Sequence, residues 1–342
     1  MSQNTMIIRA DADAKIGTGH VMRSLALAQA WQLQGGDVQW VTTCELAPLI
    51  KIIEENGFKL TRIQDPLDVS SVAAIIRKKP DSVIVMDGYH LNSEYQKQMC
   101  AFEVPVLVID DAALEPFYYA DFILNPVFQA DTYPYQCAES TLKLFGPRYA
   151  LLRREFEGLP TASRFPEQAT DILITMGGAD APNFSSRILD VFNTIESVDL
   201  NIRLIIGAAN PHEAKLKLKA KENRHKVKLI GQVPNLSEEI LAADVVVSAA
   251  GVTAWELAFL GVPAALVAIV DNQKDIAKGM AQSYAAVSLG SWDLWDPERA
   301  ADKLTSLITD VGQRKSLSQY AKQLVDGQGC HRVIGLLNAS IF

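Results

Sequence analysis

Short runs of Val, Ile and Leu alternate with helical patterns along most of this chain. In the first half, strand-like runs cover residues 38–42, 82–86, 106–109 and 122–124, and helical patterns cover residues 21–34, 46–55 and 69–78. Further strand-like runs cover residues 171–176, 203–206, 227–230, 244–248 and 264–267. Because the runs lack polar alternation, each strand is predicted to be buried on both faces, as in a parallel sheet covered by helices. The pattern therefore predicts an α/β fold with two sheets.

The alternation is interrupted once, at residues 158–170, where GLPTASRFPEQAT has two prolines and no hydrophobic periodicity. A chain of 342 residues also exceeds the size at which a single hydrophobic core usually stops growing. We predict an N-terminal domain over residues 1–157, a linker over 158–170 and a C-terminal domain over 171–342. Each domain is predicted to be a doubly wound, Rossmann-like sheet, with the ligand in a cleft at the carboxyl ends of the strands.

Charge and cysteine content exclude several classes of function. The net charge of −8 argues against a general nucleic-acid binder, which needs a basic surface. The four cysteines are far apart and form no CxxC pair, and no HExxH motif or His/Asp/Glu cluster indicates a metal site. The chain has no membrane-length apolar run, and its first residues lack the pattern of a signal peptide. We therefore predict a reduced, cytoplasmic protein without a cofactor, a metal or a stable membrane insertion.

Residues 7–29, IIRADADAKIGTGHVMRSLALAQ, read as a strand, a glycine loop and the start of a helix. Gly17 and Gly19 form the loop, and His20 falls in the first turn of the helix. A helix N-terminus offers unpaired N–H groups and partial positive charge, so it holds anions and favours a neutral imidazole. The segment is typical of an active-site loop that faces a phosphorylated substrate. In the alternative reading, the glycines serve only the turn and His20 caps the helix.

Two loops of the second half follow strands and carry polar or glycine residues. In MGGADAPN, Gly177 and Gly178 allow backbone to approach a ligand, and Asn183 is predicted to cap the next helix. In VDNQKD, Asn272 and Gln273 carry donors and acceptors suited to sugar hydroxyls. Both stretches are equally compatible with a simple turn before a helix.

The segment SAAGVTAWEL repeats the arrangement of a strand followed by a glycine and a helix. Its amides at Gly251 and Val252, with the Thr253 hydroxyl, are suited to a diphosphate. Glu256 is predicted in the first turn of that helix, where its carboxylate would accept hydrogen bonds from ribose hydroxyls. The alternative is that Glu256 only complements the helix dipole.

These motifs together resemble a known group of proteins. GTGH, then VKLIGQVPNLSEEILAADVVVSAAGVTAWELAFLGVPA, then DNQ, are similar to the two-domain GT-B fold of the UDP-N-acetylglucosamine transferases of lipid II synthesis. Adding RADADAKIGTGHVMRSLALA, DGY, GPRYALLRREF and MGGADAPN, the chain more closely resembles the hydrolases that release UDP from UDP-2,4-diacetamido-2,4,6-trideoxy-β-L-altropyranose in pseudaminic acid biosynthesis. The resemblance covers almost the whole chain.

The resemblance implies a role for each matching residue. His20 would be the catalytic base, and Tyr89 and Asn272 would line the sugar pocket. It assigns the UDP contacts to Ile230 and Val233 for uracil, Glu256 for the ribose, and Gly251, Val252 and Thr253 for the diphosphate. One departure is that Ala249 and Ala250 stand where the family often has paired glycines, so the methyl group of Ala250 is expected to narrow the approach of a phosphate.

The implied reaction is the attack of water on the anomeric carbon with inversion, without a metal, and with a UDP-sugar as the small-molecule partner. A GT-B glycosyltransferase with a hydroxyl acceptor is the first alternative, because fold alone does not separate the two reactions. A non-catalytic protein that binds nucleotide sugars is the second, although it would have no need of His20 beside the glycine loop.

Overall fold

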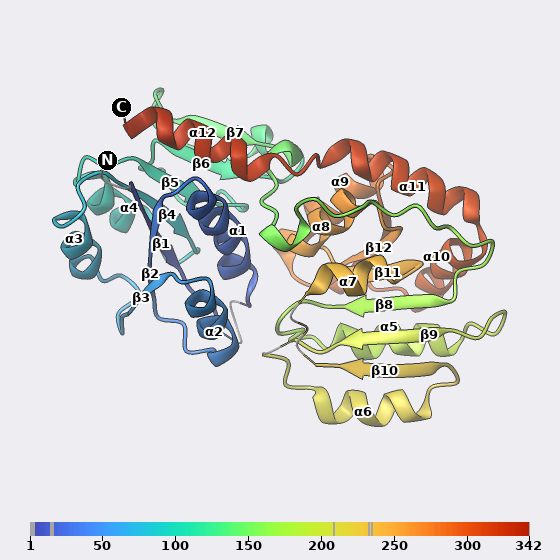
Figure 1. Cartoon of the computed structure of the whole chain (residues 1–342). Helices are drawn as coiled ribbons and strands as arrows, with labels where there is room; N and C mark the ends of the chain where they lie inside the picture. Colours follow the sequence, from blue (N-terminus) through green and yellow to red (C-terminus); the bar gives the residue numbers. More distant parts are fainter. Residues whose placement is uncertain (1–3, 14–16, 208, 232, 234, 342) are drawn as a thin grey trace. The chain divides into compact units, whose positions relative to one another are not determined.

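The computed structural model describes residues 4–13, 17–207, 209–231, 233 and 235–341. The chain forms two compact units, Met1–Arg154 with Gly327–Phe342, and Glu155–Asp326 (Figure 1). The predicted boundary at residue 157 lies close to the first crossing between them. The C-terminal stretch differs from the prediction, because helix α12 (Gly329–Ile341) belongs to the first unit and not to the second.

The first unit is built on a seven-stranded sheet of parallel strands in the order β3-β2-β1-β4-β5-β6-β7. Its strands are β1 (Thr5–Ala10), β2 (Asp37–Thr42), β3 (Lys59–Arg62), β4 (Ser82–Asp87), β5 (Val106–Ile109), β6 (Phe122–Asn125) and β7 (Leu142–Phe145). Its other helices are α1 (Gly19–Leu33), α2 (Ala47–Glu55), α3 (Ser70–Ile76) and α4 (Ser93–Cys100). Strand order reverses between β1 and β4, which is where open α/β sheets bind their ligands.

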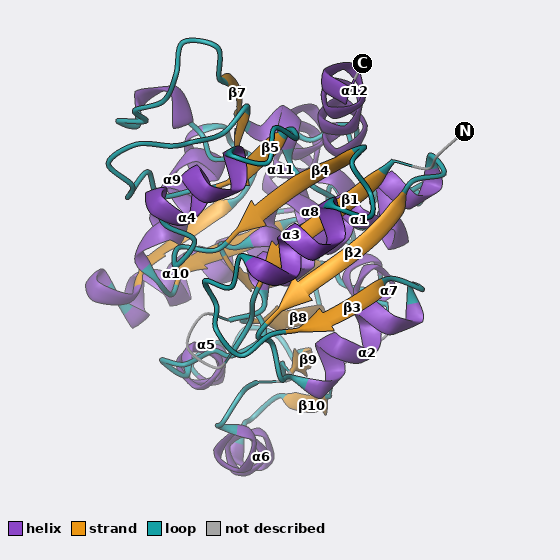
Figure 2. Cartoon of the chain, turned by 90° about the vertical axis from the view of Figure 1, so that its left-hand side faces the viewer, coloured by secondary structure: helices purple, strands orange, loops and turns teal. Residues whose placement is uncertain are grey.

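Both faces of this sheet are buried, as the unbroken apolar runs predict. Met6 and Ile8 of β1 contribute to the core that contains the apolar residues of α1 and α12. Ile7 belongs to a second core, which includes residues of α3 and α4. Figure 2 shows α3 and α4 in front of the sheet. Packing on both faces therefore fixes the position of the central strands, and with them the position of the residues at their carboxyl ends.

The second unit repeats the arrangement with a six-stranded parallel sheet in the order β10-β9-β8-β11-β12-β13. Its strands are β8 (Asp171–Thr175), β9 (Asn201–Ile205), β10 (Lys226–Ile230), β11 (Val245–Ala249), β12 (Ala264–Ala268) and β13 (Val287–Ser291). Its helices are α5 (Phe184–Asn193), α6 (Glu213–Glu222), α7 (Leu236–Leu241), α8 (Val252–Leu260), α9 (Lys274–Gln282), α10 (Pro297–Thr309) and α11 (Val311–Leu324). Here the strand order reverses between β8 and β11.

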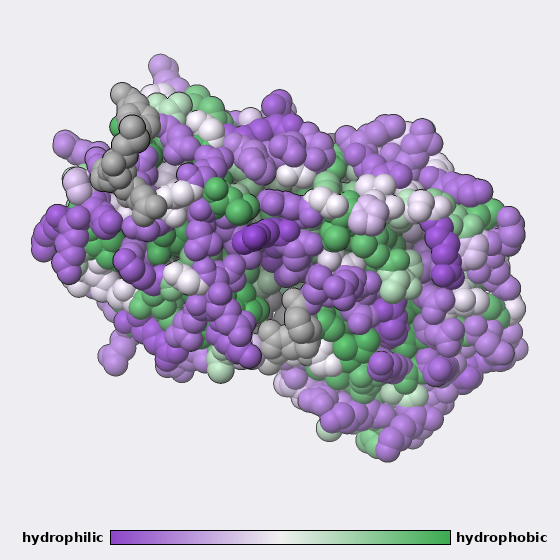
Figure 3. All heavy atoms as spheres, in the orientation of Figure 1, coloured by the Kyte–Doolittle hydropathy of each residue, from purple (hydrophilic) through white to green (hydrophobic). Residues whose placement is uncertain are grey.

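The prediction of two doubly wound sheets is confirmed, but it missed three strands. These are β3, β7 and β13, whose residues are largely half-buried or exposed and include Lys, Thr, Arg and Ser. All three lie at sheet edges. An edge strand is partly exposed to solvent, so its sequence can include polar residues and need not be a continuous apolar run. The face drawn in Figure 3 is mainly hydrophilic, with smaller hydrophobic areas between. No helix in the described ranges is long and apolar enough to cross a membrane.

Candidate functional site

His20 and Asp87 meet at the carboxyl edge of the first sheet, where its strand order reverses. Gly17 has a φ of +81°, and α1 begins at Gly19, so His20 is the second residue of the helix, as predicted. Asp87 ends β4 and is fully buried. His20 Nδ1 lies 2.6 Å from Asp87 Oδ1. Because an ionised carboxylate only accepts, we place the ring proton on Nδ1, which leaves Nε2 as a proton acceptor.

Arg23 fixes this pair from the next turn of α1. It donates from Nε to Asp87 Oδ2 (2.6 Å) and from Nη2 to Asp87 Oδ1 (2.7 Å), a two-point contact that sets the plane of the carboxylate. Its Nη1 donates to Asp111 Oδ2 at 2.7 Å. Burial alone would raise the pKa of Asp87, but Arg23 and then His20 lower it to about 2. Asp87 is therefore a carboxylate at neutral pH.

Tyr89 closes the cluster beside His20. The two rings are nearly perpendicular, with centroids 5.0 Å apart, and the Tyr89 hydroxyl donates to Asp111. Burial would raise the pKa of Asp111, but Arg23 and the Tyr89 hydroxyl lower it. Tyr89 remains 39% exposed. The structure thus brings two of the predicted site residues, His20 and Tyr89, into contact around a shared pair of carboxylates.

A second acid–histidine pair lies after β1. His90 Nε2 is 2.8 Å from Asp11 Oδ2, and Asp11 also accepts from the Thr42 hydroxyl at 2.7 Å and the Thr43 amide at 2.6 Å. Arg9 lies 3.2 Å from the same carboxylate. Burial would raise the pKa of Asp11, but these partners lower it. His90 therefore lies against the Asp11 carboxylate just after the end of β1.

Sequence reasoning assigned no role to Arg23, Asp111 or Asp11, and it used Asp87 only as part of a motif. The available signal was that Asp11, Asp87 and Asp111 each come at or just after the end of a buried strand. Strands β1 and β4 are parallel neighbours, with Ala10 paired to Asp87. Acidic residues at such positions gather at one edge of a parallel sheet.

In the second unit, the loop before α8 meets the loop after β12. Gly251 is the N-cap of α8, and Val252 and Thr253 form its half-exposed first turn. Gln273 uses its Oε1 to accept from the Ile269 amide at 3.0 Å, and its Nε2 lies 3.5 Å from the place a Cβ would take at Gly251. An amide donor therefore stands beside the helix N-terminus to which the diphosphate was assigned.

Two expectations about this helix need correction. Because α8 begins at Val252, Glu256 lies in its second turn and not its first, and it is only 1% exposed. At that position it is too far along the helix to complement the exposed N–H groups of the first turn. Ala250 is fully buried and its amide donates to Val267 O at 2.9 Å, so its methyl group does not narrow an exposed surface.

The loop after β8 has the glycine geometry predicted, but a different helix cap. Gly177 has a φ of +76°. A Cβ at Gly207 would lie 2.4 Å from the carbonyl oxygens of both Gly177 and Gly178, so the two loops pack backbone against backbone. Asn183 makes no side-chain cap; Asp180 accepts from the amides of Phe184 and Ser185 instead, at 2.7 and 3.0 Å.

The predicted uracil segment follows β10. Ile230 ends that strand, and its carbonyl accepts from the Ile206 amide at 2.8 Å. One of its two backbone groups is therefore already engaged within the sheet region. Val233 is half-buried, whereas Gln232, which the predicted segment includes, lies outside the described residues.

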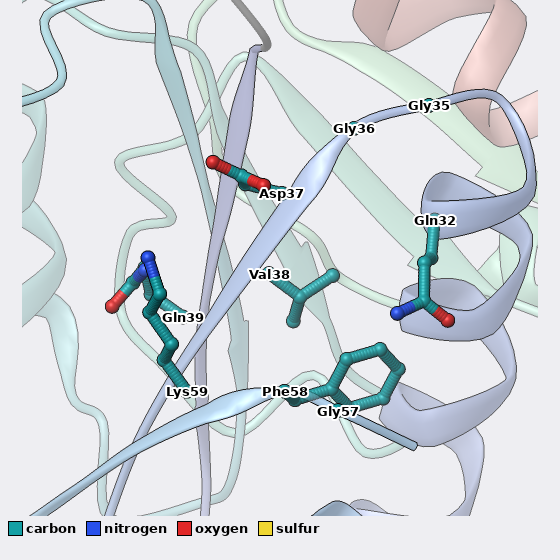
Figure 4. A pocket seen from close by; sticks show the side chains of 9 residues that line it. All are labelled: Gln32, Gly35, Gly36, Asp37, Val38, Gln39, Gly57, Phe58 and Lys59. Atoms are coloured by element: carbon teal, nitrogen blue, oxygen red, sulfur yellow. The ribbon is translucent and has the colours of Figure 1, made fainter.

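A pocket of about 210 Å³ opens at the opposite edge of the first sheet. It is formed by the turn between α1 and β2 and the turn before β3, with Gln32, Asp37, Phe58 and Lys59 among its lining residues (Figure 4). This is the amino edge of β2, and none of the predicted site residues lines the pocket. Among the described residues, no group of three or more His, Cys, Asp or Glu side chains is arranged to hold a metal ion.

Residues 171–325 match the sequence model of the Glycosyltransferase family 28 C-terminal domain. Over its whole length, the structure is similar to the crystal structure of MurG from Acinetobacter baumannii, with a TM-score of 0.70, 19% identity and coverage of 98% and 99% of the two chains. The chain has the GT-B fold. The predicted fold class is therefore confirmed.

Curated relatives share low sequence identity with this chain but align with most of its length. The chain is 28% identical over 262 residues to an uncharacterized protein, MJ1062, from Methanocaldococcus jannaschii. This alignment covers 74% of this chain but only 53% of MJ1062. It is 22% identical to the spore coat polysaccharide biosynthesis protein SpsG of Bacillus subtilis, covering 96% of each. It is 24% identical to the UDP-2,4-diacetamido-2,4,6-trideoxy-beta-L-altropyranose hydrolase of Campylobacter jejuni, covering 81% of this chain and 96% of that enzyme.

Proposed function

We propose that this protein hydrolyses a UDP-linked diacetamido-trideoxy sugar, UDP-2,4-diacetamido-2,4,6-trideoxy-β-L-altropyranose, to UDP and the free sugar in pseudaminic acid biosynthesis. The observation that carries the proposal is the contact between His20 and Asp87, which leaves His20 Nε2 as a base. The similarity to the Campylobacter jejuni hydrolase supports the choice of substrate.

In the proposed reaction, His20 Nε2 takes a proton from water while the water oxygen attacks the anomeric carbon. A bond forms between that oxygen and the carbon, and the bond from the carbon to the diphosphate oxygen breaks as UDP leaves from the opposite face. Inversion is the result. Because UDP is a good leaving group at neutral pH, one base suffices, unlike the two carboxylates of ordinary glycoside hydrolysis.

Asp87 and Arg23 would serve this step without touching the substrate. Asp87 accepts the Nδ1 proton of His20, so it fixes the tautomer and stabilises the imidazolium that forms. Arg23 holds the Asp87 carboxylate with two hydrogen bonds and so fixes its plane. Tyr89, whose hydroxyl is engaged by Asp111, would use the exposed part of its ring to line the sugar pocket.

The second unit would hold UDP. The first-turn amides of α8 with the Thr253 hydroxyl would bind the diphosphate, and Gln273 would add a donor beside Gly251. Glu256 would bind the ribose, and Asn272 would bind the sugar. The loop of Gly177 and Gly178 would approach the diphosphate. Ile230 and Val233 would contact uracil. A helix N-terminus and amide donors stabilise a departing diphosphate without a metal.

A glycosyltransferase is the second candidate, favoured by the family 28 match over residues 171–325 and by the likeness to MurG. Such an enzyme would use the same base on an acceptor hydroxyl. Release of UDP from a UDP-sugar panel in the absence of any acceptor distinguishes the two: a hydrolase turns over fully, whereas a transferase needs the acceptor.

The bond that breaks is tested by hydrolysis in oxygen-18 water. The proposal expects the label in the anomeric hydroxyl of the sugar. Label in the phosphate of UDP would show attack at phosphorus and would refute it. The anomer released, followed by NMR before mutarotation, reports inversion directly.

A further inference from the structure

Exposed apolar side chains gather on two turns at the carboxyl edge of the second sheet. One turn follows β12 and begins after Val270, and the other follows β13 and contains Trp292 and Leu294. The exposed fractions are 45% for Val270, 46% for Trp292 and 78% for Leu294. Strands β12 and β13 are parallel neighbours, so both turns leave the sheet at the same edge as α8. We call these three residues the apolar wall.

Trp292 makes polar contacts with both turns. Its indole Nε1 donates to Asp271 Oδ1 at 3.3 Å. Lys274 Nζ lies 2.8 Å from both Asp271 Oδ1 and Asp293 Oδ2, and 5.7 Å from the centroid of the Trp292 ring. These contacts tie the two turns together. With its N–H engaged, the exposed part of the indole offers a carbon surface and no hydrogen-bond donor.

The wall lies next to the position proposed for the diphosphate. Gln273 Nε2 lies 3.5 Å from the place a Cβ would take at Gly251, at the start of α8. Asp271, two residues earlier in the same 3₁₀ turn, accepts the hydrogen bond from Trp292. A 3₁₀ helix rises about 2 Å per residue, so Asp271 and Gln273 are about 4 Å apart along its axis. The turn therefore links the position proposed for the diphosphate to Trp292 over a distance comparable with one sugar ring.

We propose that the apolar wall forms one side of the sugar subsite and favours UDP-sugars with acylamino or deoxy substituents over fully hydroxylated ones. A carbon surface gains free energy when it covers methyl groups, but it leaves a sugar hydroxyl without a partner. Trp292 is the main specificity-determining residue of this wall. This inference rests on the proposed UDP site of the second unit.

The test compares binding of UDP, UDP-N-acetylglucosamine and UDP-glucose to the full chain by calorimetry. The native protein should bind UDP-N-acetylglucosamine about tenfold more tightly than UDP-glucose, the effect of a small apolar group in an apolar site. Trp292→Ala should reduce this preference to about twofold or less, with the affinity for UDP unchanged. Trp292→Phe keeps an aromatic face, so it should retain most of the preference even though it lacks the bond to Asp271.

Tyr284→Ala is the matched control, because Tyr284 is a 67% exposed aromatic residue in the turn before β13, at the opposite edge of the sheet. It should leave the preference intact. A Trp292→Ala protein that is folded by circular dichroism and keeps the tenfold preference would overturn the inference, as would a native protein with no preference. Failure of the native protein to bind UDP would instead refute the proposed function, and this inference with it.

Discussion

Replacing His20 or Asp87 by Asn should separate catalysis from stability within one pair of contacting side chains. In His20→Asn, the amide nitrogen takes about the place of Nδ1, so the donor to Asp87 is kept while the Nε2 acceptor is lost. We expect kcat to fall by about 10²–10⁴, the contribution of a general base. The free energy of unfolding should change by less than about 1.5 kcal/mol, because the charged hydrogen bond survives.

Asp87→Asn should affect both quantities. Asp87 accepts from His20, from two nitrogens of Arg23 and from the Ser24 hydroxyl, all in a fully buried position. A neutral amide would direct its nitrogen towards one of these donors. It would also leave Arg23 with only one of its two carboxylate partners, Asp111. Breaking a buried pair in this way costs about 3–5 kcal/mol. Activity should fall as well, because the tautomer of His20 is no longer fixed.

Urea unfolding of the two variants, followed by circular dichroism alongside a UDP-release assay, makes the comparison. The loss in Asp87→Asn should be confined to the transition of the first unit, because Asp87 belongs to it. Equal stability losses in the two variants would refute the reasoning. So would a His20→Asn protein with native turnover.

Four further predictions concern UDP binding, acid stability, loop packing and metals. Glu256→Ala should weaken UDP binding by about 1.5–3 kcal/mol, the range for a hydrogen bond to a charged group, and an unchanged calorimetric affinity in a folded variant would exclude the ribose role. The folded pKa of Asp87 is about 2, below its ordinary value of 3.8, so this carboxylate stabilises the first unit above about pH 4 and the contribution is lost as the pH falls through 2. Urea midpoints measured from pH 6 to pH 2 should show that loss in the native protein, and a smaller one in Asp87→Asn. Gly207→Ala should destabilise the second unit by about 1–3 kcal/mol, because the new methyl group would meet two carbonyl oxygens, whereas Gly231→Ala, which meets nothing within 4 Å, should not. Turnover should persist in excess chelator, and its loss, with recovery on adding magnesium, would contradict the metal-free reaction.

Local signals in the sequence predicted much of the fold. Residues 7–29 placed His20 in the first turn of a helix because a strand, two glycines and a run of periodic apolar residues are adjacent in the chain. The central strands were equally clear, because burial on both faces leaves a continuous apolar run. The start of α8 was predicted correctly, because the helix begins at Val252 within the segment expected to open it, but Glu256, four residues later, lies in the second turn and not in the first.

The partners of His20 could not be read from the sequence in the same way. Asp87 and Asp111 are 64 and 88 residues from Arg23, and only the order of the strands brings them together. The same limit explains why α12 was assigned to the wrong unit. Its hydrophobic pattern indicates that one face of the helix is buried, but it does not indicate in which unit. Edge strands such as β3 lack a distinctive pattern for the physical reason that half of their surface faces solvent.

The return of α12 to the first unit makes the second unit an insertion within the first. Val333, Ile334 and Leu337 of α12 are fully buried in the core that contains Leu25 and Leu27 of α1. Full burial of three such side chains contributes about 5–9 kcal/mol, comparable with the whole stability of a domain. During synthesis on the ribosome, the second unit therefore emerges complete while the first still lacks part of its core. We therefore expect the first unit to complete its core only after the inserted unit has been synthesised, because α12 follows that unit in the chain.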